Sequence, residues 1–155
     1  MVVFICGVCC AGKKTVTGMI LNMLADLGVQ GRYIDGFATP VPSAAMLRLR
    51  ARAVELAREV PVVTGSAWEG SSDSINFLIE VVADPDIRYQ RALAANSALS
   101  RVEFEQRDEV LQVQAACHSN VWHMRVQNNE TPEALKARLH QYVQVIDQLF
   151  SKEGK

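Results

Sequence analysis

Near its start the sequence carries a continuous apolar run, VVFIC at residues 2–6, which leads directly into the segment GVCCAGKKT at residues 7–15. A run of β-branched and aromatic residues without polar alternation is typical of a strand buried on both faces of a parallel sheet. From Lys13 onward apolar side chains recur at helical spacing as far as Leu27, and Gly28 supplies a stop. This stretch therefore predicts a buried strand, a glycine-containing loop and an amphipathic helix.

Apolar runs and amphipathic stretches alternate along the rest of the chain. Further strands are expected at residues 32–34, 60–64, 78–83 and 121–128. Further helices are expected at residues 43–59 with Ser43 as N-cap, 85–95, 101–116, and from Pro132 to about residue 150 with Thr131 as N-cap. This alternation predicts a three-layer α/β fold, a five-stranded parallel sheet with helices on both faces. We expect a single domain over residues 1–155, with ligands bound outside the carboxyl ends of the strands.

Composition narrows the classes of function. The formal net charge is −1 and charged residues make up 21% of the chain, so no global charge favours nucleic acid or membrane surfaces. The first apolar run has no basic flank and is too short for a signal peptide or a membrane span. We expect a cytoplasmic protein with reduced cysteines that binds neither nucleic acid nor membrane. A homodimer is an open possibility.

The segment GVCCAGKKT has the spacing of a phosphate-binding loop, with Gly7, Gly12 and Lys13 at its fixed positions. Glycines let backbone N–H groups converge on a phosphate, the following helix adds its positive end, and the lysine reaches the outer phosphates. The expected nucleotide-binding residues are Gly7, Ala11, Gly12, Lys13, Lys14, Thr15 and Val16. The alternative is an ordinary turn between strand and helix with two solvated lysines.

The same segment resembles the loop of the nucleoside monophosphate kinases, which also place a non-hydroxyl residue after the lysine and then a threonine. Residues 79–93, IEVVADPDIRYQRAL, resemble the fourth strand and lid-bearing helix of small kinases of this group. FEQRDE at 104–109 and RVQNNETPEALKARL at 125–139 are similar to segments of kinases related to adenylate kinase and dephospho-CoA kinase. The resemblance therefore implies the P-loop NTPase fold of the nucleotide kinase superfamily.

This resemblance implies ATP and Mg²⁺ as cofactors, with Thr15 in the position of the hydroxyl that meets the metal. It also implies a lid-like segment near residues 88–110. The candidate lid arginines are Arg88, Arg91, Arg101 and Arg107, which could neutralise charge on the transferred phosphoryl group. Lys13, Asp35, Arg91 and Arg107 are the expected catalytic residues. The alternative is that the arginines pair with nearby glutamates and aspartates on a solvated helix face.

A compact acceptor-binding segment is expected near residues 36–60. Asp35 ends the second predicted strand, where a carboxylate could orient an acceptor hydroxyl or a metal-bound water. Asp followed by Gly is equally a common turn pair. Arg48 and Arg52 share one helix face and are candidates for binding a phosphate of the acceptor, although surface solvation is the commoner role.

One residue departs from the pattern of these kinases. The third strand usually ends in an aspartate that holds magnesium through water, whereas here Thr64 stands in that position. Either Asp35, Glu69 or Asp73 supplies the charge, or catalysis is weak. The expected function is an ATP-dependent phosphotransferase acting on a nucleoside monophosphate or related nucleotide. The alternative is a catalytically weak ATP-binding regulatory module of the same fold.

The cysteines of the loop add a separate hypothesis. Cys9 and Cys10 stand at a helix N-terminus beside two lysines, an environment that lowers thiol pKa values and raises sensitivity to oxidation.

Overall fold

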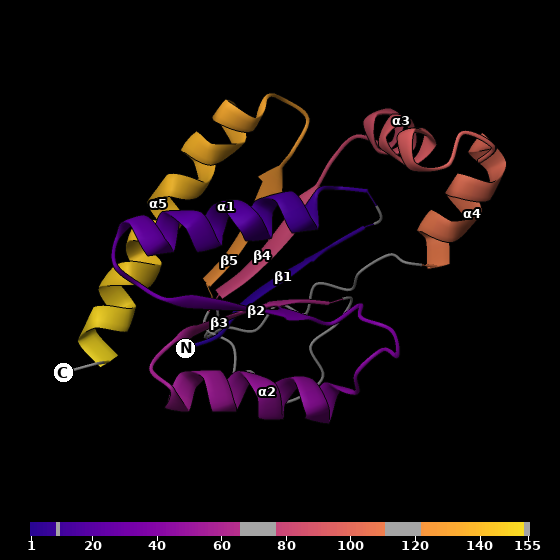
Figure 1. The fold of residues 1–155 in the computed structure, drawn as a ribbon. Coiled ribbons are helices and arrows are strands. Elements are labelled where there is room, and N and C mark those ends of the chain that lie inside the picture. Colours follow the sequence, from indigo (N-terminus) through magenta and orange to yellow (C-terminus); the bar gives the residue numbers. More distant parts are fainter. Residues whose placement is uncertain (9, 66–76, 111–121, 154–155) are drawn as a thin grey trace.

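The computed structural model describes residues 1–8, 10–65, 77–110 and 122–153. The strands are β1 (Val3–Gly7), β2 (Gly31–Asp35), β3 (Val60–Thr64), β4 (Phe77–Val82) and β5 (Trp122–Gln127). The helices are α1 (Lys13–Asp26), α2 (Ala44–Leu56), α3 (Pro85–Ala95), α4 (Arg101–Val110) and α5 (Pro132–Glu153). The strands form one sheet in the order β2-β3-β1-β4-β5, and every neighbouring pair is parallel (Figure 1).

The predicted three-layer α/β fold is confirmed. Helices α1 and α5 cover one face of the sheet and α2 covers the other (Figure 1). Successive side chains of β1 point to opposite faces. Val3 and Ile5 lie in the core shared with α1 and α5, whereas Phe4 and Cys6 lie in the core shared with α2. The uninterrupted apolar run in the sequence is therefore the strand with a core on each side.

Helix starts follow the predicted caps. The Ser43 hydroxyl accepts a hydrogen bond from the Met46 backbone N–H at 3.1 Å. The Thr131 hydroxyl accepts one from the Ala134 N–H at 3.3 Å, and Pro132 is the first residue of α5. Each hydroxyl satisfies a backbone donor that the first helical turn leaves without a partner. The expected helix 101–116 is described as α4 only to residue 110, so its last part lies outside the described residues.

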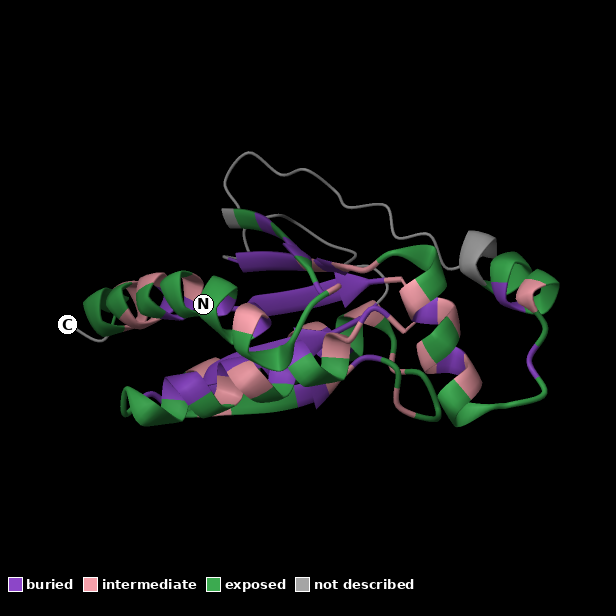
Figure 2. Cartoon of the chain, turned by 90° about the horizontal axis from the view of Figure 1, so that it is seen from above, coloured by how far each residue is buried: buried purple, intermediate pink, exposed green. Residues whose placement is uncertain are grey.

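Helices α3 and α4 form a hairpin beyond the ends to which the strand arrows point (Figure 2). A small apolar cluster of Ala92, Leu99 and Phe104 holds the two helices together. The hairpin corresponds to the segment that the sequence marks as lid-like. Within the described residues, no helix has the length and apolar character needed to cross a membrane.

Truncating the buried Leu139 tests the core between α5 and the sheet. Its side chain is 0% exposed, whereas Leu56 on α2 is 69% exposed. We expect Leu139→Ala to lower the free energy of unfolding by about 2 to 5 kcal/mol, because it leaves a cavity, and Leu56→Ala to change it by less than about 0.5 kcal/mol. Guanidinium titration followed by circular dichroism measures both. Equal losses for the two variants would contradict the packing described.

Candidate active site

The predicted phosphate loop follows β1, the central strand, and lies at the carboxyl edge of the sheet. Gly7 is packed so closely on β4 that an added Cβ would lie 2.4 Å from the Val81 carbonyl oxygen. Cys10 and Gly12 have positive φ values of 59° and 102°. Left-handed residues that interrupt the chain in this way bend the backbone into a concavity whose N–H groups converge, the arrangement that binds anions. Cys9 lies outside the described residues.

Lys13 reaches back across this loop. Its ammonium donates hydrogen bonds of 2.9 Å to the carbonyl oxygens of both Gly7 and Val8. The same Nζ lies 5.3 Å from the centre of the Phe37 ring, a cation–π distance. The loop therefore holds a positive charge at its mouth, next to the turn that follows β2.

Of the other predicted loop residues, two are buried and two are exposed. Ala11 and Val16 are buried in the core, so their side chains pack against the interior of the protein. Only their backbone can face a ligand. Lys14 and Thr15 are exposed on the first turn of α1. Thr17 is the buried hydroxyl of this turn and donates to the Lys13 carbonyl at 2.7 Å. Of the two threonines, Thr15 is thus the one open to solvent.

Arg91 is the candidate lid arginine that contacts the loop. Its guanidinium donates to the carbonyl oxygens of Cys10 at 3.2 Å, Ala11 at 3.3 Å and Asn128 at 2.7 Å. The Asn128 side-chain amide donates to the same Ala11 oxygen at 2.9 Å. Asn128 is a site residue that the sequence did not single out, although it stands in the turn after the last strand, within a segment that resembles the kinases.

Arg88, Arg101 and Arg107 lie in the same hairpin as Arg91 but make other contacts. Arg88 is buried, donates to the Ala83 carbonyl at 2.9 Å and lies 5.5 Å from the Phe104 ring centre. Arg107 is exposed on α4. All four arginines therefore belong to the α3–α4 hairpin, and Arg91 is the one that the structure brings into contact with the loop.

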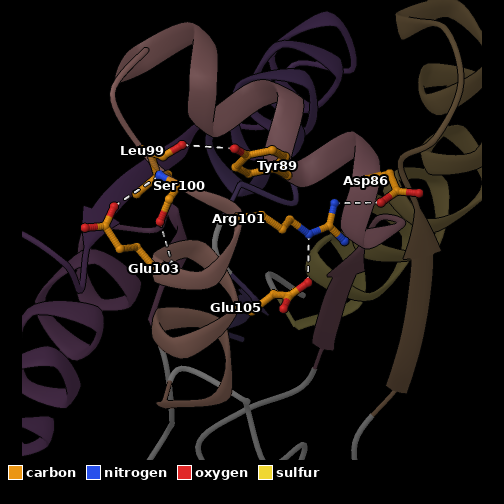
Figure 3. A network of polar contacts seen from close by, with 7 residues as sticks. All are labelled: Asp86, Tyr89, Leu99, Ser100, Arg101, Glu103 and Glu105. Carbon is orange, nitrogen blue, oxygen red and sulfur yellow. Dashed lines mark hydrogen bonds and ion pairs between the residues drawn. The ribbon is translucent and has the colours of Figure 1, made fainter.

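A polar network ties the hairpin together (Figure 3). Arg101 binds Asp86 at 2.7 Å and Glu105 at 2.8 Å, and these carboxylates raise the pKa of its guanidinium. The sequence alternative of arginines paired with acidic neighbours is therefore realised for this residue. The Tyr89 hydroxyl donates to the Leu99 carbonyl at 3.0 Å, which fixes the connection between the helices.

Ser100 and Glu103 begin α4 with a capping box (Figure 3). The Glu103 N–H donates to the Ser100 hydroxyl at 3.2 Å, and the Ser100 N–H donates to the Glu103 carboxylate at 3.1 Å. These bonds lower the pKa of the Glu103 carboxyl. The spacing of Ser and Glu is a signal that the sequence contained. The capping box therefore adds to the contacts that hold the hairpin together.

The residues predicted for the acceptor side, and Thr64, stand at the ends of β2 and β3. Asp35 is half-buried, and its carboxylate accepts a hydrogen bond from the Phe37 N–H at 2.8 Å, as a turn residue does. Asp35 is also the register partner of Thr64. Thr64 is buried, and its hydroxyl lies 3.0 Å from the Tyr33 hydroxyl. Burial raises the pKa of the Tyr33 phenol.

The structure does not bring Arg52 to this place. Its side chain lies 3.6 Å from Glu55 and lines a cavity of about 370 Å³ together with Met1 and Glu153, at the edge where the strands begin. Arg48 is half-buried about one turn earlier in α2. The alternative carboxylates Glu69 and Asp73 lie outside the described residues.

Of the two cysteines expected to be reactive, Cys9 lies outside the described residues, and the reactivity of Cys10 stays a prediction. Cys6 is buried, and burial, followed by the charge of Glu80, raises the pKa of its thiol to about 11. Cys10 is half-buried and packs against the apolar cluster of the α3–α4 hairpin. Across the described ranges, no group of three His, Cys, Asp or Glu side chains is arranged to hold a metal ion.

The comparisons with known proteins rest on structure. No family model and no curated protein matches the chain. A sugar kinase from Janibacter sp. HTCC2649 superimposes with a TM-score of 0.61 at 13% identity, over 95% of this chain and 96% of that one. A gluconokinase from Sinorhizobium meliloti 1021 does so with a TM-score of 0.55 at 12% identity, over 99% and 97%. An uncharacterised protein from Eubacterium ventriosum ATCC 27560 gives 0.59 at 8% identity, over 94% and 98%.

The sugar kinase and the gluconokinase share the fold of this chain over nearly its whole length. In this chain the fold is a five-stranded parallel sheet with helices on both faces, and the segment GVCCAGKKT follows the central strand. The three-layer α/β fold expected from the sequence is therefore confirmed, and it is the fold of these two kinase structures.

Alkylation tests the burial of Cys6. At about pH 8 a thiol whose pKa is about 11 is ionised in about one molecule in a thousand, and the thiolate is the reactive form. We expect iodoacetamide to label Cys6 only in guanidinium, as read by tandem mass spectrometry. Raising the pH above 9 should also lower the stability of the fold, because the unfolded thiol loses its proton first. Rapid labelling of Cys6 in the folded protein would contradict its placement.

Proposed function

We propose that the chain is an ATP-dependent phosphotransferase that phosphorylates a small acceptor, with a nucleoside monophosphate or related nucleotide as the acceptor class. The observation that carries the proposal is that the predicted phosphate loop and the turn after β2 contact each other. Lys13 of the phosphate loop lies 5.3 Å from the ring of Phe37, and the Phe37 N–H is bound by the Asp35 carboxylate. A lysine suited to the donor phosphates and a carboxylate suited to the acceptor thus both contact Phe37, the lysine at its ring and the carboxylate at its backbone N–H.

Phosphoryl transfer requires mainly that donor and acceptor are held in line while the charge of the moving group is neutralised. The N–H groups of the loop and the N-terminus of α1 offer positive potential for the phosphates of ATP. In the proposal Lys13 leaves the carbonyls of Gly7 and Val8 and binds the outer phosphates. Asp35 orients the acceptor hydroxyl.

The donor set fits a magnesium ion of the kind that kinases use. Magnesium prefers oxygen ligands and is usually bound through one or two protein groups together with waters and substrate phosphates. Thr15 offers an exposed hydroxyl on the first turn of α1, and Asp35 offers a half-buried carboxylate. When bound, the ion would neutralise charge on the phosphates.

The exposure of Phe37, 42% for the whole residue, supports an acceptor with a flat base that can stack on its ring. The likeness in fold to two named kinases supports a second class of acceptor for this chain. Their names describe a sugar kinase and a gluconokinase, so polyhydroxy compounds such as gluconate are the competing substrates. The resemblance of the sequence to nucleotide kinases, together with Phe37, makes nucleotides our first choice.

One observation favours the alternative of a catalytically weak ATP-binding module. Thr64 is buried and engaged with Tyr33, so the end of β3 offers no carboxylate to magnesium. In that alternative ATP binds at Lys13 but no acceptor accelerates its consumption.

A screen of ATP consumption separates these functions. The acceptors to be tried are the nucleoside monophosphates, dephospho-CoA, shikimate and gluconate. We expect one nucleotide to stimulate turnover, and Lys13→Ala to lower it by about 100-fold or more, because a donor aimed at the transferred group is lost. Lys136→Ala on α5 is the matched control, since it removes an exposed lysine. If ATP binds in a Lys13-dependent way and no acceptor stimulates turnover, the kinase proposal is wrong.

Asp35→Asn tests the carboxylate without disturbing the turn, because an asparagine oxygen can still accept from the Phe37 N–H. We expect turnover in the ATP-consumption assay to fall by about 100-fold or more. Asp26→Asn at the exposed end of α1 makes the same chemical change outside the site. Full turnover in Asp35→Asn would exclude Asp35 from the reaction.

A further inference from the structure

We propose that Arg91 and Asn128 are positioning residues that set the phosphate loop in its anion-binding form by holding two loop carbonyls from the side away from the ligand. The role rests on the proposed function, because the ligand of the loop is the nucleotide. It differs from the direct contact with phosphate that the resemblance implies for Arg91.

The contacts converge on two consecutive peptide groups. Arg91 donates to the Cys10 and Ala11 carbonyls, and Asn128 donates to the Ala11 carbonyl as well. The second terminal nitrogen of Arg91 donates to the backbone carbonyl of Asn128 at 2.7 Å, so the two residues are also hydrogen-bonded to each other. Helix α3, the loop after β1 and the turn after β5 therefore meet in one hydrogen-bonded unit.

Peptide geometry turns these contacts into a constraint on the ligand side. A trans peptide is planar, and its C=O and N–H groups point in opposite directions. When the Ala11 carbonyl is fixed toward Arg91 and Asn128, the Gly12 N–H must point to the opposite side. The Cys10 carbonyl fixes the preceding peptide plane, whose Ala11 N–H donates to the Val8 carbonyl at 3.3 Å and closes a turn within the loop. The two side chains thus orient the Gly12 N–H without touching the ligand.

The fit around Gly12 supports a built contact. A Cβ added there would lie 2.2 Å from the Asn128 amide nitrogen, so the glycine makes room for Asn128 as well as supplying φ 102°. Asn128 is 8% exposed, and a buried amide of this kind is costly to leave without a partner. The side chain of Cys10 packs against the hairpin cluster, which adds an apolar contact on the same side of the loop.

The test separates positioning from direct contact with phosphate by a double-mutant cycle. Arg91→Ala and Asn128→Ala are each expected to weaken ATP affinity by about tenfold, and the double variant by much less than about a hundredfold, because both hold one carbonyl. Arg91→Lys should not rescue affinity, because an ammonium cannot span the three carbonyls that the guanidinium reaches. Arg138→Ala is the control, since Arg138 donates to the Gln127 carbonyl beside the same turn.

Hydrogen exchange of residues 10–13 without nucleotide supplies a readout that needs no ligand. We expect faster exchange in Arg91→Ala and unchanged exchange in Arg138→Ala. Additive losses of ATP affinity, rescue by Arg91→Lys, or unchanged exchange in Arg91→Ala would each overturn the proposal. If the parent protein fails to bind ATP while Arg91→Ala still speeds exchange, the positioning role stands and the proposed function falls.

Discussion

The site depends on β1 being the central strand, hydrogen-bonded to β3 and β4 and buried on both faces. Because both neighbours and both cores hold this strand, the loop that follows it leaves the sheet at a fixed point. Gly7 fits tightly against Val81 of β4, so the loop starts beside the strand that leads into α3. The packing of the central strand therefore decides which helix can reach the loop, and that helix carries Arg91.

Local patterns in the sequence were enough to predict the layers of this fold. The unbroken apolar run at 2–6 predicted a doubly buried strand, and Ser43 and Thr131 marked helix starts, because each signal acts within a few neighbouring residues. The pattern that predicts a phosphate loop is local as well, since Gly7, Gly12 and Lys13 fall within seven consecutive residues. The capping box of Ser100 and Glu103 was equally local and could have been predicted.

The partners of the arginines could not be predicted in this way, because they depend on strand order and helix direction. Arg91 binds the loop only because β4 lies next to β1, which the sequence does not specify. Arg48 and Arg52 share a helix face, yet α2 runs back toward the edge where the strands begin. Its later turns therefore carry Arg52 to the side of Met1 and away from Lys13.

The order of the strands also bears on the absence of an aspartate at Thr64. Asp35 and Thr64 are register partners on neighbouring strands, and such strands lie about 4.8 Å apart. A carboxylate absent from the end of β3 is thus present one strand away, at the same height along the sheet. The Thr64 hydroxyl is hydrogen-bonded to the Tyr33 hydroxyl. The last residue of β3 therefore carries no charge, whereas the last residue of β2 carries a carboxylate. The proposed function therefore assigns both the acceptor and the metal to Asp35, whose carboxylate binds the N–H of Phe37, the residue whose ring Lys13 contacts.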